Sequence, residues 1–118
     1  IYKMAEKENI VVDTHCAIKS PNGYINGLPE WVVKPMSPKI IVLIEGRPTE
    51  VVRRRAEDPT RQRADFGGEQ DVVEHQDVAR AIAASVSGFT GARIKVILNE
   101  QGKLDEAARK LRDVLQST

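Results

Sequence analysis

Three short apolar segments predict the strands of the fold. Residues 9–15 are a short, mostly β-branched apolar run that ends in polar residues, and residues 40–44 within the segment 39–45 are continuously aliphatic; such runs are typical of strands buried on both faces of a parallel sheet. Residues 93–99 form a third strand, with apolar and polar positions alternating at its start. Asp13 closes the first run, and we expect it at the carboxyl end of a buried strand, where ligands of parallel sheets bind.

Apolar positions recur at helical spacing between and after these strands. Gly88 ends the longest of these stripes, as glycine often ends a helix. Residues 1–8 have the pattern of a helix entered part-way, so we expect the 118 residues to be the C-terminal portion of a longer protein. The alternation of strands and helices predicts an α/β layer fold in a single domain, residues 1–118. The predicted helices are residues 48–56, 70–88 and 104–115.

Two segments show neither the apolar pattern of a strand nor that of a helix. Residues 16–38 are punctuated by proline and glycine, which predicts an irregular, functional loop with one helical turn at residues 29–33. Residues 58–69 are a polar excursion between two helices and end in Phe66-Gly67-Gly68. We predict that this excursion is a lid that closes over a substrate and excludes water.

Composition narrows the class of protein. Hydrophobic residues at 41% and charged residues at 30% are ordinary for a globular domain. A formal net charge of +1 argues against bulk electrostatic binding to nucleic acid. Cys16 is the only cysteine, which excludes an intrachain disulfide and fits a reducing, cytoplasmic setting. No apolar run in the 118 residues is long enough to span a membrane, and none of their segments resembles a signal peptide.

Positive charge is concentrated in one span, residues 51–65, which contains five arginines and no lysine. A solvated basic helix end would explain one or two of them. Five favour a site that holds several anionic oxygens, because each guanidinium offers donors in a rigid fork. The span therefore predicts a clamp for a polyphosphate. Its arginines are Arg53, Arg54, Arg55, Arg61 and Arg63.

Other chemistry has weaker support. A carboxylate in the position of Asp13 is suited to Mg²⁺, although a capping role is the alternative. His15 and His75 are the only histidines, which is weak evidence for a zinc site. Thr14 or Ser20 could act as a nucleophile, but no Gly-x-Ser-x-Gly motif accompanies them. No Gly-x-x-x-x-Gly-Lys-Ser/Thr phosphate-binding loop occurs in the 118 residues.

Taken in order, six segments make the chain resemble the archaeal type of adenylate kinase. The resemblance implies an α/β fold of the P-loop NTPase kind, a three-layer parallel sheet known as the nucleoside monophosphate kinase fold. It also implies that this fold is incomplete at the N-terminus and carries a short lid insertion. The segments are Asn-Ile-Val-Val-Asp-Thr-His (9–15), Lys-Ser-Pro-Asn-Gly-Tyr (19–24), Gly-Leu-Pro-x-Trp-Val (27–32), Arg-Arg-x-x-Asp-x-Thr-Arg-x-Arg (54–63), Glu-His-Gln (74–76) and Thr-Gly-Ala-Arg-Ile-Lys-Val-Ile-x-Asn (90–99).

By this resemblance, Asp13 lies near the Mg²⁺ that accompanies ATP. The turn from Asn99 to Gly102 lies beside the adenine of ATP, and His15 and Lys19 lie near the monophosphate-side loop. That loop consists of Gly27, Leu28 and Pro29; Glu30 follows where bacterial relatives have arginine, so no phosphate-binding role is assigned to it. The arginines that match phosphate-contacting positions are Arg54, Arg55, Arg61, Arg63 and Arg80.

The implied reaction is ATP + AMP ⇌ 2 ADP, with ATP, AMP and ADP as partners and a homo-oligomer, often a trimer, in archaeal relatives. We expect the 118 residues alone to be inactive, because no phosphate-binding loop is among them. Two alternatives remain open. One is a non-catalytic module that binds nucleotide or RNA phosphates, and the other is a different nucleoside monophosphate kinase.

Overall fold

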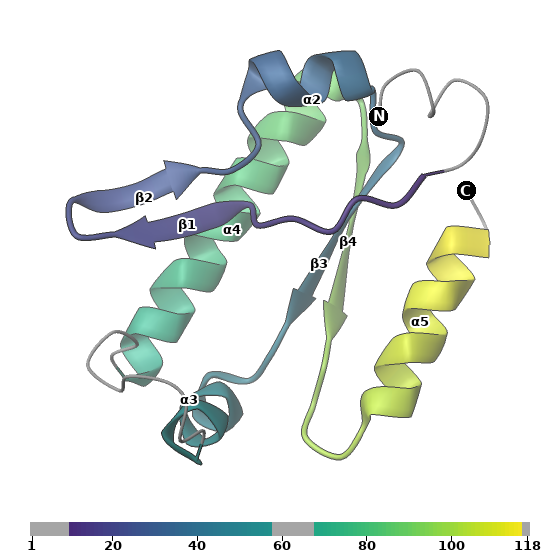
Figure 1. Ribbon diagram of the computed structural model, residues 1–118. Coiled ribbons are helices and arrows are strands. Elements are labelled where there is room, and N and C mark those ends of the chain that lie inside the picture. The colour runs from purple at the N-terminus through teal and green to yellow at the C-terminus, as the bar shows by residue number, and fades with distance from the viewer. Residues whose placement is uncertain (1–9, 58–67, 117–118) are drawn as a thin grey trace. The chain divides into compact units, whose positions relative to one another are not determined.

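The computed structural model describes residues 10–57 and 68–116 (Figure 1). The helix end expected at residues 1–8, and the part of the predicted lid that carries Arg61 and Arg63, lie outside the described residues. The chain divides into two compact units, one within Ile1–Ile41 and Val78–Ile94, the other within Val42–Asp77 and Lys95–Thr118. The elements are β1 (Ala17–Ser20), β2 (Gly23–Asn26), α2 (Glu30–Met36), β3 (Ile40–Glu45), α3 (Pro48–Glu57), α4 (Glu69–Thr90), β4 (Arg93–Leu98) and α5 (Leu104–Gln116).

The strands β3 and β4 pair side by side as a parallel sheet (Figure 1). At one end the amide of Arg93 donates to the carbonyl oxygen of Lys39 at 3.0 Å, and at the other the amide of Asn99 donates to that of Glu45 at 2.7 Å. Donors and acceptors advance in the same direction along the two strands, as in a parallel ladder. The prediction of parallel strands in these two segments is therefore confirmed.

The core of the first unit forms where α4 meets the segment around α2. Val33 and Val86 are 2% and 1% exposed, and they form a buried cluster with Leu28. Ile82, Val86 and Phe89 follow one another at intervals of four and three residues, so a single face of α4 supplies the contacts. This confirms the apolar stripe predicted for that helix. The partly buried residues packed against the cluster are Cys16, Ile41, Ile82 and Phe89.

The expectation of an irregular loop at residues 16–38 is wrong at its start, where β1 and β2 form an antiparallel hairpin. Ala17 pairs with Asn26, and Ser20 pairs with Gly23 across the turn. The side-chain hydroxyl of Ser20 donates to the carbonyl oxygen of Gly23 at 2.5 Å. Gly23 has a φ of 129°, which glycine adopts with little steric cost. The Pro-Asn-Gly sequence is the turn that joins the two strands.

The single turn predicted at residues 29–33 is too short, because α2 extends to Met36. Pro29 is its N-cap, where the missing amide hydrogen of proline leaves no helical hydrogen bond unmade. Ser37 ends the helix in the left-handed conformation, with a φ of 50°, and its amide donates to the carbonyl oxygens of Val33 and Lys34. The last turn thus contains Pro35 and is closed by a backbone cap.

The strand predicted at residues 9–15 is also wrong, because residues 10–15 belong to neither sheet of the described structure. Val11 and Val12 are 73% and 40% exposed, and Asp13 is exposed as well. A β-branched run becomes a strand only where its backbone groups find a neighbouring strand. Among the described residues, β3 and β4 pair with each other, and β1 pairs with β2.

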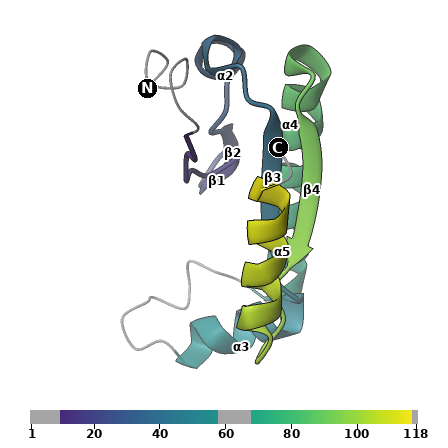
Figure 2. The ribbon, with the colours of Figure 1, turned by 90° about the vertical axis from the view of Figure 1, so that its right-hand side faces the viewer.

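In the second unit, α5 runs back along β4 (Figures 1 and 2). Ala107 is buried, whereas Leu104 and Leu115 near the two helix ends are exposed. Each of the three predicted helices is confirmed, with ends that differ from the prediction by at most two residues. No helix within residues 10–57 and 68–116 combines the length and apolar character needed to cross a membrane.

Candidate functional site

The loops that follow β3 and β4 leave the sheet at the same edge, because the two strands are parallel. The hydrogen bond from the Asn99 amide to the Glu45 carbonyl oxygen is the last one of this pairing. Beyond it, one loop enters α3 and the other turns into α5. Ligands of parallel α/β sheets bind outside the carboxyl ends of the strands, so this edge is where a site is expected.

An open pocket of about 170 Å³ lies at this edge, within the second unit. It brings together Arg54 from α3 and Asn99 from the end of β4, two residues that the resemblance assigns to phosphate and adenine contacts. Arg54 is exposed, and its Nε donates a long hydrogen bond of 3.4 Å to the carbonyl oxygen of Glu50 one turn earlier. The pocket is lined by Ile44, Glu45, Gly46, Val51, Arg54 and Asn99.

Gly46 makes the pocket possible. A Cβ atom there would lie 2.6 Å from Cγ2 of Val51 and 3.2 Å from one terminal guanidinium nitrogen of Arg54. The amide of Gly46 donates to Oε1 of Gln76 on α4 at 3.0 Å. A residue without a side chain therefore lets the arginine approach the backbone after β3, while α4 holds that backbone in place.

Two side-chain contacts join the segment after β3, from Arg47 into the first turn of α3, to the turn after β4. Nε and one terminal nitrogen of Arg47 donate to Oε2 of Glu100, at 3.3 and 3.2 Å. The amide of Gln101 donates to Oε2 of Glu50 at 2.8 Å. Sequence reasoning assigned no role to Arg47 or Glu50, and it included Glu100 and Gln101 only as members of the turn from Asn99 to Gly102. Contacts between residues about fifty positions apart leave no local pattern. Gly46 and Gln76 were likewise not assigned.

The predicted residues of the monophosphate-side loop lie in the first unit. The amide of Gly27 donates to the carbonyl oxygen of Cys16 at 2.8 Å, and a Cβ atom at Gly27 would collide with the carbonyl oxygen of His15. Leu28 is buried, and its amide donates to Oδ1 of Asn26 at 2.7 Å. The structure thus brings His15 together with Gly27, and the loop continues through Pro29 into α2.

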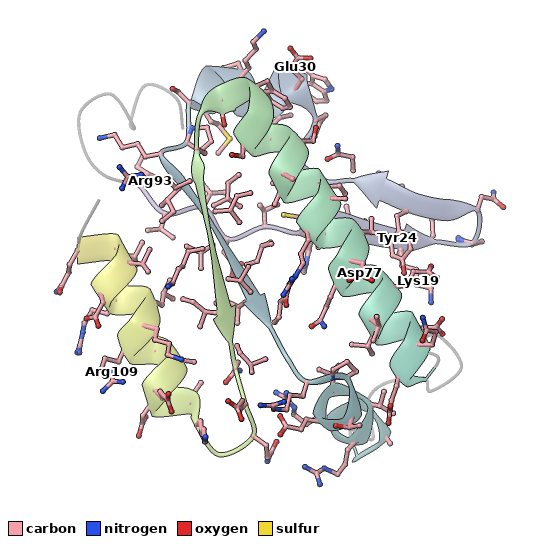
Figure 3. The ribbon with its side chains drawn as sticks, turned by 180° about the vertical axis from the view of Figure 1, so that it is seen from behind. Lys19, Tyr24, Glu30, Asp77, Arg93 and Arg109 are labelled. Carbon is pink, nitrogen blue, oxygen red and sulfur yellow. The ribbon has the colours of Figure 1, made fainter. Side chains whose placement is uncertain are left out.

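Lys19 stands on the hairpin, opposite Tyr24 in the pairing of β1 with β2, and Figure 3 shows both side chains there. Arg80 is exposed on α4, in the first unit. Arg55 belongs to α3, but only its backbone is described. Gly102 has a φ of 77° in the turn between β4 and α5.

A magnesium ion is implied by the resemblance, and Asp13 is the residue assigned to it. Within the described residues no three His, Cys, Asp or Glu side chains gather as a metal site. Mg²⁺ in phosphoryl-transfer sites keeps several waters and binds one or two carboxylates together with the phosphates of the substrate. A single exposed carboxylate such as Asp13 fits that kind of binding.

A larger hollow of about 400 Å³ lies on α2, lined by Glu30, Trp31, Lys34 and Pro35. Glu30 and Lys34 form an ion pair with each other at 3.0 Å, so the two charges there compensate one another. None of the predicted site residues lines this hollow. The pocket at Arg54 is therefore the better candidate, although it is smaller.

Comparison with known families agrees with the fold. A family profile described as an AAA domain matches residues 1–72, more than half of the chain. The chain belongs to the AAA domain family. The predicted fold class, α/β of the P-loop NTPase kind with parallel strands, is thereby confirmed.

Several archaeal adenylate kinases are similar to this chain. The chain is 43% identical over 118 residues to the adenylate kinase of Methanopyrus kandleri, covering 99% of this chain and 62% of that protein. It is 46% identical over 116 residues to that of Methanocaldococcus jannaschii, and 43% identical over 113 residues to that of Thermoplasma acidophilum. These matches cover 98% and 96% of this chain, and 60% and 61% of the two proteins. The resemblance to archaeal adenylate kinases is confirmed, and the chain spans about three fifths of these relatives.

Proposed function

We propose that the chain is part of an adenylate kinase and contributes to the reaction ATP + AMP ⇌ 2 ADP. The observation that carries this proposal is the identity of 39–46% to proteins named adenylate kinase, over at least 93% of the chain. The pocket at the carboxyl edge of β3 and β4 supports it, because Arg54 and Asn99 meet there. A transferase that binds nucleotides follows from the same relatives.

Phosphoryl transfer requires alignment and charge neutralisation more than it requires a protein nucleophile. Arg54 stands at the pocket with an exposed guanidinium, which can donate two parallel hydrogen bonds to phosphate oxygens. We assign the same role to Arg55, Arg61, Arg63 and Arg80. Such contacts stabilise the charge that develops on the phosphate oxygens in the transition state.

The nucleosides are assigned to two backbone turns. The turn from Asn99 to Gly102 would receive the adenine of ATP, since Asn99 lines the pocket that Arg54 enters. The loop of Gly27, Leu28 and Pro29 would receive AMP, with His15 and Lys19 near it. Gly27 approaches the backbone at His15 so closely that this loop is held by main-chain contacts.

We assign Mg²⁺ to Asp13, which would hold it directly or through water while the nucleotide phosphates supply the other ligands. When bound there, the ion would neutralise charge on the nucleotide phosphates. Asp13 is exposed, so its carboxylate is accessible for this role. A homo-oligomer stays a prediction from the resemblance.

The test joins the chain to the segment of the Methanocaldococcus jannaschii adenylate kinase that it does not cover. Phosphorus NMR would follow ATP and Mg²⁺ with AMP, CMP, GMP or UMP in turn. We expect ADP from AMP, and no product from the 118 residues alone. Binding of nucleotide without turnover in the joined protein would favour a non-catalytic module. Faster turnover with another monophosphate would assign a different nucleoside monophosphate kinase.

A further inference from the structure

Glu50 contacts one residue that lines the candidate pocket and one residue of the turn after β4. Its main-chain carbonyl oxygen accepts the 3.4 Å hydrogen bond from Nε of Arg54, and its side-chain Oε2 accepts the 2.8 Å hydrogen bond from the amide of Gln101. Arg54 lines the pocket from α3, and Gln101 belongs to the turn that follows Asn99, another lining residue. One residue in the first turn of α3 therefore connects the arginine with the turn after β4.

A second contact runs in parallel. Arg47 donates through two nitrogens to Oε2 of Glu100, and Lys103 lies 3.9 Å from the same oxygen. We call Arg47, Glu50, Glu100 and Gln101 the brace. The brace begins where the main-chain hydrogen bonds between β3 and β4 end. Beyond that point, side chains hold the two segments together.

We propose that the brace is a positioning device, which sets the turn from Asn99 to Gly102 at the distance from Arg54 that an adenine nucleotide requires. The proposal rests on the function proposed above, because it takes Arg54 for the phosphates and this turn for the base. Glu50 and Glu100 do not touch the nucleotide in this scheme. They hold the turn in place before the nucleotide binds, so the turn loses less conformational freedom on binding.

Stability alone does not account for the brace. The side chains of Arg47 and Glu100 are 54% and 28% exposed. Ion pairs that are this exposed to solvent contribute little to the free energy of unfolding. An acidic residue in the first turn of α3 also favours the helix dipole, but that effect needs no contact with Gln101. The contact with the amide of Gln101, in the turn after β4, is the feature that a capping role leaves unexplained.

The experiment separates base binding from phosphate binding in the 118-residue chain. Proton–nitrogen NMR titrations with ATP and with tripolyphosphate give two affinities, whose ratio reports the contribution of the adenosine. Glu50→Ala keeps the main-chain oxygen that Arg54 contacts and removes only the carboxylate that holds Gln101. We expect the ATP affinity to fall about tenfold, the size of one charge-assisted hydrogen bond, with the tripolyphosphate affinity unchanged.

Two further variants test whether the change in affinity is specific to the contact between Glu50 and Gln101. Glu50→Gln retains a side-chain oxygen that can accept from the Gln101 amide, and it should recover most of the affinity. Glu30→Ala is the matched control, because Glu30 is an exposed carboxylate in an ion pair on α2, in the other unit. It should leave both affinities unchanged. If Glu50→Ala does not fold, Glu100→Ala tests the brace by removing the acceptor of Arg47, with the same expected change in the ratio.

The outcomes distinguish this inference from the proposed function. A wild-type chain that binds ATP no better than tripolyphosphate, or binds neither, overturns the brace, whereas turnover by the joined protein decides the proposed function separately. If the wild-type chain prefers ATP and Glu50→Ala preserves that preference, only the brace is overturned. An equal loss of ATP and tripolyphosphate affinity would place the effect of Glu50 on the phosphate side and would also overturn the brace. A tenfold loss confined to ATP, with recovery in Glu50→Gln, supports it.

Discussion

The amide of Gly46 donates a hydrogen bond to Oε1 of Gln76, across 3.0 Å. Gly46 is the first residue after β3, and Gln76 lies in the N-terminal half of α4. The contact fixes the point at which the chain leaves the sheet and starts toward α3. A terminal guanidinium nitrogen of Arg54 lies 3.2 Å from where a Cβ atom of Gly46 would be. The contact with Gln76 therefore also affects where the arginine of the candidate pocket lies.

Replacing Gln76 by alanine should destabilise the second unit by about 1 kcal/mol, because a part-buried amide loses its acceptor. The midpoint of urea unfolding measures the change. Gln70→Ala is the control, since Gln70 is exposed at the start of the same helix and should shift the midpoint by less than about 0.5 kcal/mol. Equal effects of the two substitutions would remove the structural role assigned to Gln76.

Two glycines should respond to alanine with opposite signs. A Cβ atom at Gly27 would collide with the carbonyl oxygen of His15, which is backbone and cannot rotate away as a side chain can. We expect Gly27→Ala to cost about 1–3 kcal/mol. Gly88 lies inside α4 with no atom within 4 Å of such a Cβ, so Gly88→Ala should stabilise by about 0.5–1 kcal/mol. Thermal melts of the two variants check the signs, and a stabilised Gly27→Ala would contradict the close approach.

The elements that the sequence predicts correctly are those with a strong period and a partner within the chain. Ile97 is 1% exposed in β4, although the first four residues of that strand are exposed, and Val86 is 1% exposed in α4, as an apolar helix stripe requires. The hairpin escapes prediction because each strand has four residues, and Ile18 and Ile25, which pair with each other, are both exposed. Its apolar side chains therefore do not alternate in the way that indicates a half-buried strand.

The candidate site is predictable only in part. Arg54 and Asn99 follow from the resemblance, and the structure places both at one pocket. Gln76, Glu50 and Glu100 act through single contacts between distant segments, which no local period encodes. The prediction of a strand at residues 9–15 is wrong for the converse reason. The composition of this run favours a strand but does not specify the neighbouring strand with which it would pair.

Burial raises the pKa of the Cys16 thiol. The folded state then binds the thiol proton more tightly than the unfolded state, whose thiol titrates near 8.5. The stability this contributes is complete below that pH, and it is lost as the pH rises through the higher pKa of the folded state. Urea midpoints measured from pH 7 to pH 10 should decline more in the wild-type chain than in Cys16→Ala. Iodoacetamide should also alkylate Cys16 more slowly at pH 8.5 in the native chain than in urea, and equal rates would contradict the raised pKa.

Arg54 and Arg53 are adjacent on α3 and equally cationic, which makes them a matched pair for the phosphate assignment. Both are exposed, but only Arg54 lines the pocket at Gly46. Arg54→Lys keeps the charge and loses the planar fork, so the affinity of the chain for tripolyphosphate should fall by about tenfold. Arg53→Lys should leave it unchanged. Isothermal titration calorimetry at fixed salt measures both affinities, because the attraction of exposed charges is screened by ions. Equal tripolyphosphate affinities of the two variants would show that the arginines act only as a basic helix end. That result would contradict a phosphate clamp at the carboxyl ends of β3 and β4.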